Sequence, residues 1–493
     1  MTASLILTCI IVYFLALIAI SYFTTRKLSA SSYFNGDKSS PWYVIAFGML
    51  GDSLSGVTFI SVPGAVLLAK FGYFQLVMGY MVGYLAIIFI LLPIYYRMNL
   101  TSIYSYLFER FGIYTQYTGA FFFMLSRILG SAARLYLAAT VLQLFIFDSY
   151  GVPFAVSVSI IILLIWLYTI RGGIKTLVWT DTFQSMLLIL GVVFSVVAIC
   201  GNLNISWSEA YRIVQNDSRS QIFFWDIWDK SNFYKQFFGG AFIALCMTGL
   251  DQNMMQKNLT CKSLGESQKN LFWFSIIMLI TNLFFLSLGV LLYYFAEQKG
   301  ISLPLKSDGN VFTDNVFPYL ALNHLGFLAS ISFVVGLTAA TFSSADSVLT
   351  TLTTSFYIDI LGKKTDSQTD TKLRHAIHIG FAVILLIAIL IIKAVNTGSV
   401  IDIVLRIANF TYGPLLGLFM FGIFSKRMVK DSIVPILCII VPFITFYLDS
   451  HPFQILGKDF LFGNTILIVN GFLTFIGLLI IHYLFWDKKV KSD

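Results

Sequence analysis

Residues 51–56 read Gly-Asp-Ser-Leu-Ser-Gly and lie in the middle of an apolar segment that extends over residues 43–69. Glycine lowers helix propensity, and Ser and Asp side chains offer the backbone competing hydrogen bonds, so a continuous helix is disfavoured here. Unwound backbone at membrane depth is tolerated only where its carbonyl groups line a cavity or coordinate a cation. A kinked helix with satisfied serines is the alternative, but the charge of Asp52 makes it costly. The stretch therefore predicts a broken helix beside a binding site.

The whole chain has the composition of a polytopic membrane protein. Of its 493 residues, 58% are hydrophobic and 11% are charged, and the mean hydropathy is +0.83. A soluble domain carries roughly 25% charged residues. Apolar segments of about 20 residues recur, the length that crosses roughly 30 Å of hydrocarbon. Soluble, disordered and fibrous classes are excluded. The first segment, 4–23, is too long for a signal peptide and is expected to remain as a span.

We predict thirteen transmembrane helices in an all-α fold. They cover residues 4–23, 43–69, 73–96, 117–147, 152–170, 177–200, 236–256, 272–297, 325–360, 375–395, 399–425, 432–448 and 464–485. Most of the 32 Lys and Arg residues fall in loops on one side, which predicts a cytoplasmic C-terminus and an N-terminus outside. The net charge of +8 therefore reports topology and not nucleic-acid binding. The expected location is the cell inner membrane or the plasma membrane.

A second irregular segment lies five spans after the first. In span 236–256, the pairs 239–240 (Gly-Gly) and 248–249 (Thr-Gly) flank residues 241–247. The odd offset makes the two segments enter the membrane from opposite sides, as in inverted repeats that meet at a midplane site. Residues 1–493 would then form one transport domain with an extra helix at 4–23, a first repeat at 43–200, a second repeat at 236–425 and two further helices at 432–485.

The ninth span contains a cluster of hydroxyl groups and one acid. Residues 339–347 read Ala-Ala-Thr-Phe-Ser-Ser-Ala-Asp-Ser. On a helix, Ser343, Asp346 and Ser347 share a face, and Ser344 lies about 100° round. Hydroxyls that bond to the preceding turn would explain the serines but not Asp346. A carboxylate costs roughly 2.5 to 3.5 kcal/mol at this depth, so a bound cation or a proton is expected to neutralise it.

A second buried acid, Asp181, follows residues 179–180 (Trp-Thr) near the start of the sixth span. From these residues alone, the favoured interpretation is a helix N-cap. The chain has no phosphate-binding loop and no Ser-His-Asp order, and its longest loop, 201–235, is too short for a nucleotide-binding domain. We therefore expect a transporter that is not an enzyme and does not hydrolyse ATP, with no obligatory protein partner.

Four motifs resemble the sodium:solute symporter family, and the resemblance covers nearly the whole chain. They are residues 171–176 (Arg-Gly-Gly-Ile-Lys-Thr) followed by 179–181 (Trp-Thr-Asp), 251–257 (Asp-Gln-Asn-Met-Met-Gln-Lys), 343–347 (Ser-Ser-Ala-Asp-Ser) and 413–419 (Gly-Pro-Leu-Leu-Gly-Leu-Phe). The family includes bacterial sialic acid, proline and galactose transporters. The resemblance implies a leucine-transporter-like fold of two five-helix inverted repeats. It also implies sodium-coupled uptake of a small polar organic solute by alternating access.

The resemblance further implies one or two sodium sites. The first would use the carbonyl groups of Gly51, Leu54 and Ala340 and the hydroxyls of Ser343 and Ser344. The second would use Asp181 together with Ser343, Asp346 and Ser347. Asp346 stands where relatives usually have a serine, so this site could bind sodium more strongly or could titrate instead.

By position in the family, six residues would face the solute cavity: Ser55, Thr58, Phe59, Tyr80, Arg134 and Phe242. Arg127 and Arg134 are seven residues apart and share a helix face. A buried guanidinium fits a carboxylate in two-point fashion, which favours an anionic solute such as a sialic acid, a sugar acid or another carboxylate. The alternative is that both arginines pair internally, with Asp52 as the candidate partner.

Other functions remain as alternatives. A sodium-coupled sugar or amino acid symporter is one, although Ala244 and Met247 stand where galactose transporters carry polar side chains. A passive channel or a solute sensor of the same fold would belong to a different class. The paired oxygen sites argue against the channel, and the lack of a signalling domain argues against the sensor.

Overall fold

The computed structural model describes residues 3–25, 32–306, 308–363, 370–395, 400–451, 453–455 and 458–485. Residue 399, the predicted start of the eleventh span, lies outside them. The helices are α1 (Ala3–Thr25), α2 (Ser32–Asn35), α3 (Trp42–Ser53), α4 (Gly56–Ala69), α5 (Gly72–Ala86), α6 (Leu92–Arg97), α7 (Ser105–Arg110), α8 (Ile113–Phe145), α9 (Phe154–Leu203), α10 (Trp207–Asn216), α11 (Phe233–Ala244), α12 (Gln252–Asn258), α13 (Leu264–Lys299), α14 (Thr313–Asn323), α15 (Phe327–Ser355), α16 (Thr371–Val395), α17 (Val400–Phe424), α18 (Val434–Ser450) and α19 (Ile466–Phe485). Two short strands, β1 (Phe453–Ile455) and β2 (Lys458–Phe460), pair antiparallel in one loop.

The described residues contain ten helices that are long and apolar enough to cross a membrane, or eleven if the bent pair α3–α4 counts as one span. A total of thirteen would also require the shorter apolar helix Phe154–Ile170 and the interrupted pair α11–α12. The prediction of a polytopic helical membrane protein is confirmed. The count of thirteen stays a prediction.

The first predicted break is present. Helix α3 ends at Ser53 and α4 begins at Gly56, and the two axes differ by 61°. Leu54 and Ser55, between them, have non-helical backbone angles. The carbonyl groups of the last turn of a helix have no partner within that helix. The break therefore leaves backbone oxygens near residue 54 free to bind something else.

The second break lies later than predicted. Helix α11 runs regularly through Gly239 and Gly240, continues as a π-helical turn over Leu245–Gly249 and is interrupted only at Leu250 and Asp251. A Cβ atom added to Gly240 would lie 2.1 Å from the backbone oxygen of Leu76 in α5. Gly240 thus serves the close approach of α11 to α5. A Cβ atom added to Gly239 would instead lie 2.7 Å from Asn464, and neither glycine breaks the helix.

Helix α9 joins the predicted fifth and sixth spans through a kink. Its only non-helical residue is Gly173, at φ 54°. A side chain there would also meet Tyr33, because an added Cβ would lie 2.5 Å from that residue. Since α9 resumes directly after the kink, Asp181 lies within a helix and not at its start.

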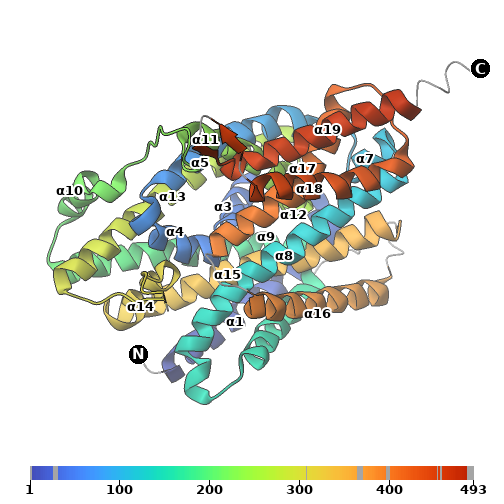
Figure 1. Cartoon of the computed structure of the whole chain (residues 1–493). Helices are drawn as coiled ribbons and strands as arrows, with labels where there is room; N and C mark the ends of the chain where they lie inside the picture. The colour runs from blue at the N-terminus through green and yellow to red at the C-terminus, as the bar shows by residue number, and fades with distance from the viewer. Residues whose placement is uncertain are drawn as a thin grey trace, which may run out of the picture.

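Helices α3, α9, α12 and α15 meet in the centre of the molecule (Figure 1). Helix α15 packs along α9 and against α3. Helix α17 packs against α8 and α19. Helix α1 begins at one end of the molecule, and α19 ends at the opposite end (Figure 1). Because α3 and α12 are in contact, the two breaks next to them lie close together in the interior.

Candidate functional site

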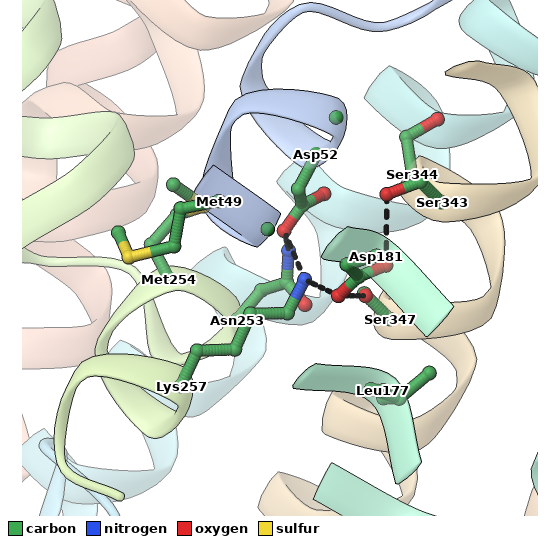
Figure 2. A network of polar contacts seen from close by, with 12 residues as sticks. Met49, Asp52, Leu177, Asp181, Asn253, Met254, Lys257, Ser343, Ser344 and Ser347 are labelled. Carbon is green, nitrogen blue, oxygen red and sulfur yellow. Dashed lines mark hydrogen bonds and ion pairs between the residues drawn. The ribbon is translucent and has the colours of Figure 1, made fainter. Parts of the chain in front are cut away.

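A buried lysine joins two carboxylates where the central helices meet (Figure 2). The Nζ atom of Lys257 lies 3.0 Å from Oδ2 of Asp52 and 2.6 Å from Oδ2 of Asp181. The amide of Asn253 also donates to Oδ2 of Asp52, at 2.6 Å. Lys257, Asp52 and Asp181 are all 1% exposed or less. The charges of α3, α9 and α12 thus form one cluster with no access to bulk water.

The two broken helices bring this cluster together. Asp52 lies in the last turn of α3, directly before the first break. Asp251 caps α12 directly after the second break, accepting from the backbone N–H of Met254 at 3.1 Å. Asn253 and Lys257 follow at i and i+4 and therefore share the face of α12 that contacts Asp52. The two segments that were predicted to meet are in contact through the Asn253–Asp52 hydrogen bond.

The hydroxyl groups of α15 complete the cluster. Ser343 donates to Oδ1 of Asp181 at 2.8 Å. Ser347 lies 3.4 Å from Oδ2 of Asp181 and 3.2 Å from Oδ1 of Asp346. Tyr168 of α9 donates to Oδ2 of Asp346 at 2.7 Å. All four residues predicted for the second sodium site lie in one connected network, and the N-cap interpretation of Asp181 is wrong.

The residues predicted for the first sodium site lie beside this network. A Cβ atom added to Gly51 would be 3.0 Å from Oγ of Ser343, so the backbone of α3 passes close to α15. Ala340 is fully buried. The hydroxyl of Ser344 donates to the backbone oxygen of Thr341 at 3.1 Å, a bond to its own preceding turn. Leu54 lies in the break itself.

A cavity of about 70 Å³ adjoins the cluster. Its walls come from α3, α5, α8, α11, α12 and α13, and it is lined by Asp52, Ser53, Tyr80, Tyr84, Arg127, Arg134, Ile243, Ala244, Met247, Thr248, Met254 and Met278. Tyr80 and Arg134 are the two predicted solute residues among them. A larger cavity of about 480 Å³ lies between the C-terminal half of α4 and the N-terminal parts of α5 and α17, with Arg406 and Lys70 in its walls.

The other four predicted solute residues do not line the small cavity. Ser55 lies in the first break, and Thr58 follows it in α4. Phe242 is on α11 but is not part of the wall that Ile243 and Ala244 form. The ring of Phe59 is fully buried in an aromatic cluster, 5.3 Å from the ring of Phe317 and 5.5 Å from that of Phe333. This contact explains Phe59 as a packing residue.

The two arginines of α8 have different surroundings. The Nε atom of Arg127 lies 2.6 Å from Oδ2 of Asp251, which also accepts a hydrogen bond from the hydroxyl of Tyr412. The predicted partner Asp52 is therefore wrong for Arg127. Arg134 is buried and lines the cavity, and it makes no ion pair with any residue in the described part of the chain. It shares the cavity wall with Asp52, the carboxylate that Lys257 and Asn253 contact.

Lys257 is at the centre of the cluster, although the sequence assigns it to no site. It was visible only as the last residue of the motif at 251–257. The spacing of Asn253 and Lys257 indicates a shared helix face, but no pattern within α12 reveals that this face meets Asp52 and Asp181, which are 205 and 76 residues away in the chain.

Comparison with known proteins agrees with this geometry. A family model described as "Sodium:solute symporter family" matches residues 33–432. The sodium/sialic acid symporter NanT of Aliivibrio fischeri is 27% identical over 420 residues, which cover 83% of this chain and 81% of that protein. SiaT of Proteus mirabilis, also described as a sodium/sialic acid symporter, is 26% identical over 429 residues, covering 84% and 83%. The sodium-coupled monocarboxylate transporter 2 of Homo sapiens is 26% identical over 410 residues, covering 81% and 64%.

Two solved structures share the arrangement of helices. One is a substrate-bound, outward-open Na⁺-coupled sialic acid symporter, with a TM-score of 0.81 at 22% identity, covering 97% of this chain and 98% of that one. The other is Mhp1, a nucleobase-cation-symport-1 family transporter, with a TM-score of 0.56 at 14% identity, covering 94% and 96%. These likenesses establish the fold and confirm that it is leucine-transporter-like.

Proposed function

The chain belongs to the sodium:solute symporter family, and we propose that the solute it carries with sodium is a small anion, a sialic acid or another carboxylate. Sodium-coupled transport of a small solute across a membrane follows from family membership, and the protein is not an enzyme. Neither the passive channel nor the solute sensor receives support from the relatives, which are symporters and transporters.

The observation that carries the proposal is the guanidinium of Arg134 in the wall of the central cavity. Arg127 is neutralised by Asp251, so Arg134 is the cation that remains available to a solute. A guanidinium presents two parallel N–H donors that match a carboxylate, and the low dielectric of the interior strengthens such a pair. The names of two relatives, both sodium/sialic acid symporters, agree with a solute that carries a carboxylate.

We propose sodium ligands in two groups. Carbonyl groups of Gly51, Leu54 and Ala340 with the hydroxyls of Ser343 and Ser344 form the first, and the close approach of Gly51 to Ser343 supports it. The second group is Asp181, Ser343, Asp346 and Ser347, and the network that joins them supports it. Hard oxygen ligands of this kind suit an alkali cation. Whether one or both groups are occupied sets the sodium stoichiometry.

Sodium in the first group would link α3 of the first proposed repeat (43–200) to α15 of the second (236–425). An ion shifts a conformational equilibrium only by its differential affinity for the two states, and the coupling to solute is reciprocal. The central cavity of about 70 Å³ is smaller than the roughly 300 Å³ of small-molecule sites, so its walls must move to admit solute. Alternating access supplies that movement.

We further propose thirteen spans, an N-terminus outside, a cytoplasmic C-terminus and insertion in the cell inner membrane or the plasma membrane. The opposite positions of the start of α1 and the end of α19 support an odd number of spans (Figure 1). The excess of basic residues in alternate loops supports the orientation.

A monocarboxylate is the second candidate solute. The small volume of the cavity favours it, and Ala244, Met247 and Met278 make part of the cavity wall apolar. A monocarboxylate transporter is also among the relatives. A sialic acid and a monocarboxylate share the carboxylate that Arg134 would bind, and they differ in the size of the remainder of the solute molecule.

Thermal stabilisation of the purified protein by solutes tests the proposal. N-acetylneuraminic acid, gluconate, lactate, galactose and proline are each added in sodium chloride and in potassium chloride. We expect a sodium-dependent shift with at least one carboxylate that bears no amine and none with galactose. Arg134→Gln should abolish that shift, and Arg134→Lys should restore only part of it. Stabilisation by galactose alone, or an undiminished shift in Arg134→Gln, would contradict an anionic solute.

A further inference from the structure

We propose that Lys257 is a tethered cation that competes with sodium for Asp181 and moves fully onto Asp52 when sodium binds. The proposal rests on the second sodium group described above, because Asp181 belongs to it. In the structure, a side chain of the transporter itself occupies the carboxylate that the ion needs.

The first step is that the ammonium of Lys257 already sits where a cation would bind. It lies 2.6 Å from Oδ2 of Asp181, and Ser347 approaches the same oxygen at 3.4 Å. The other oxygen of Asp181 accepts from Ser343. A sodium ion held by Asp181, Ser343 and Ser347 would therefore lie within a few ångströms of a full positive charge. Two cations so close in a buried site repel each other strongly.

The second step is that Asp52 can receive the displaced ammonium. Lys257 already contacts Oδ2 of Asp52 at 3.0 Å, so leaving Asp181 breaks one contact and keeps the other. The remaining oxygen, Oδ1 of Asp52, is buried and has no hydrogen-bond partner among the described residues. An unpaired buried carboxylate oxygen is costly, and a second contact from Lys257 would satisfy it.

The acids of the cluster outnumber its cations. The cluster holds three buried carboxylates: Lys257 contacts Asp52 and Asp181, and Asp346 is joined to Asp181 through Ser347. Arg127 is committed to Asp251. One lysine cannot neutralise three acids. If sodium takes Asp181 and Asp346, Lys257 is left to match Asp52, and the charges of the cluster balance more closely. Without sodium, Lys257 must serve both Asp52 and Asp181.

Displacement of Lys257 would couple sodium binding at Asp181 to the shape of the solute cavity. Asp52 lines that cavity, and Lys257 is on α12, the segment that follows the second break. Movement of Lys257 onto Asp52 would tighten the contact between α12 and α3, the two segments next to the breaks. Lys257 is therefore a positioning residue for the coupling and has no direct contact with solute.

Two variants separate this competition from a static ion pair. In Asp52→Asn, Lys257 retains only Asp181 as a charged partner, so sodium should bind more weakly. In the double variant Lys257→Met/Asp52→Asn, one charge of each sign is lost, the net charge is that of the natural protein, and Asp181 is free. Sodium should then bind more tightly. A purely structural ion pair predicts lower stability in both variants with no opposite shifts in sodium affinity.

The measurement is the melting temperature of the purified full-length protein against sodium concentration, with choline chloride holding ionic strength constant and no solute present. We expect the half-maximal sodium concentration to rise about tenfold in Asp52→Asn and to fall about tenfold in the double variant, a change small beside the Coulomb energy of two close charges. If the natural protein shows no sodium-specific shift, the proposed sodium site itself fails. If it does, but the two variants shift in the same direction or not at all, only the role of Lys257 fails.

A second measurement needs no variant. Structures of the unaltered protein in sodium and in choline should differ at Lys257. We expect its Nζ atom to contact both oxygens of Asp52 in sodium and to lie beyond hydrogen-bond distance of Asp181. An ammonium that keeps its contacts with both acids while density for an ion appears beside Asp181 would overturn the proposal.

Discussion

Arg127 and Arg134 show that neighbouring residues of one type can have different roles. Both project from one face of α8, but Arg127 contacts the cap residue of α12, while Arg134 faces the cavity without an acid partner. A buried ion pair depends on both members, because the removal of one leaves an uncompensated charge. A guanidinium whose carboxylate partner is the solute contributes little to the free energy of unfolding when no solute is bound.

We therefore expect Arg127→Gln to destabilise the protein by roughly 3 to 5 kcal/mol, because Asp251 loses its partner in the interior. Arg134→Gln should leave the unfolding transition nearly unchanged. Chemical denaturation in detergent compares the two, and Arg127→Gln/Asp251→Asn is the matched control that should recover much of the loss. Equal effects of Arg127→Gln and Arg134→Gln would show that the assignment of roles is wrong.

For individual residues, the sequence predicts which residue types belong to the site but not which residues they contact. The acid at Asp346 and the hydroxyls of Ser343 and Ser347 were identifiable because helical periodicity places them on one face. Asp181 was misread as an N-cap, because the kink at Gly173 ends and restarts α9 earlier than the hydropathy pattern indicates. The pairing of Arg127 with Asp251 and of Lys257 with two acids depends on tertiary packing between distant segments, which a single sequence does not contain.

Glycine has two opposite uses among the helical elements. Around residues 51–56 it accompanies Asp and Ser, and the helix breaks. At Gly239 and Gly240 it lies in a regular helix that packs against α5, where Gly79 and Gly83 provide the matching surface. Small residues let transmembrane helices approach closely. In the sequence, a glycine with this packing role cannot be distinguished from a glycine that breaks a helix. That ambiguity explains why the first break was predicted correctly and the second was placed too early.

The packing role makes a prediction for Gly240. The added methyl group of Gly240→Ala would lie 2.1 Å from the backbone oxygen of Leu76, so α11 and α5 would have to separate. We expect a clearly lower melting temperature, in line with the roughly 1 to 3 kcal/mol cost of overpacking. Gly380→Ala on α16 is the control, since nothing lies within 4 Å of its added Cβ, and it should be neutral or slightly stabilising. A neutral Gly240→Ala would mean that the helices are not in close contact.

For the whole molecule, the proposed orientation places the loop before α10 outside the cell and the loop after α17 inside. Two exposed positions on these two sides are Ser208, in the first turn of α10, and Lys426, in the loop after α17. In a background with the five native cysteines replaced, a membrane-impermeant maleimide should label Ser208→Cys in intact cells. It should label Lys426→Cys only after permeabilisation. Labelling in the reverse order would invert the topology, and labelling of both in intact cells would contradict an odd number of crossings between them.

The fold as a whole was more predictable than the site. Hydropathy and composition identify a polytopic helical protein because the bilayer imposes span length directly. The motifs at 251–257 and 343–347 indicate the family because they occur in order at the expected spans. The shape of the cavity was not predictable in the same way: of six residues assigned to it by position, Tyr80 and Arg134 line it, and Phe59 packs elsewhere.

Binding of radioactive sodium to the purified protein tests most directly whether an ion is held between the broken α3 and the hydroxyls of α15. We predict binding that excess sodium chloride displaces and potassium chloride does not. Ser343→Ala, which removes a hydroxyl common to both proposed groups, should weaken it by about tenfold or more, a loss of about 1.4 kcal/mol. Thr353→Ala, on the same helix but bonded to Leu349 and His378, should bind as the natural protein does. Undiminished binding in Ser343→Ala, or free displacement by potassium, would contradict the account.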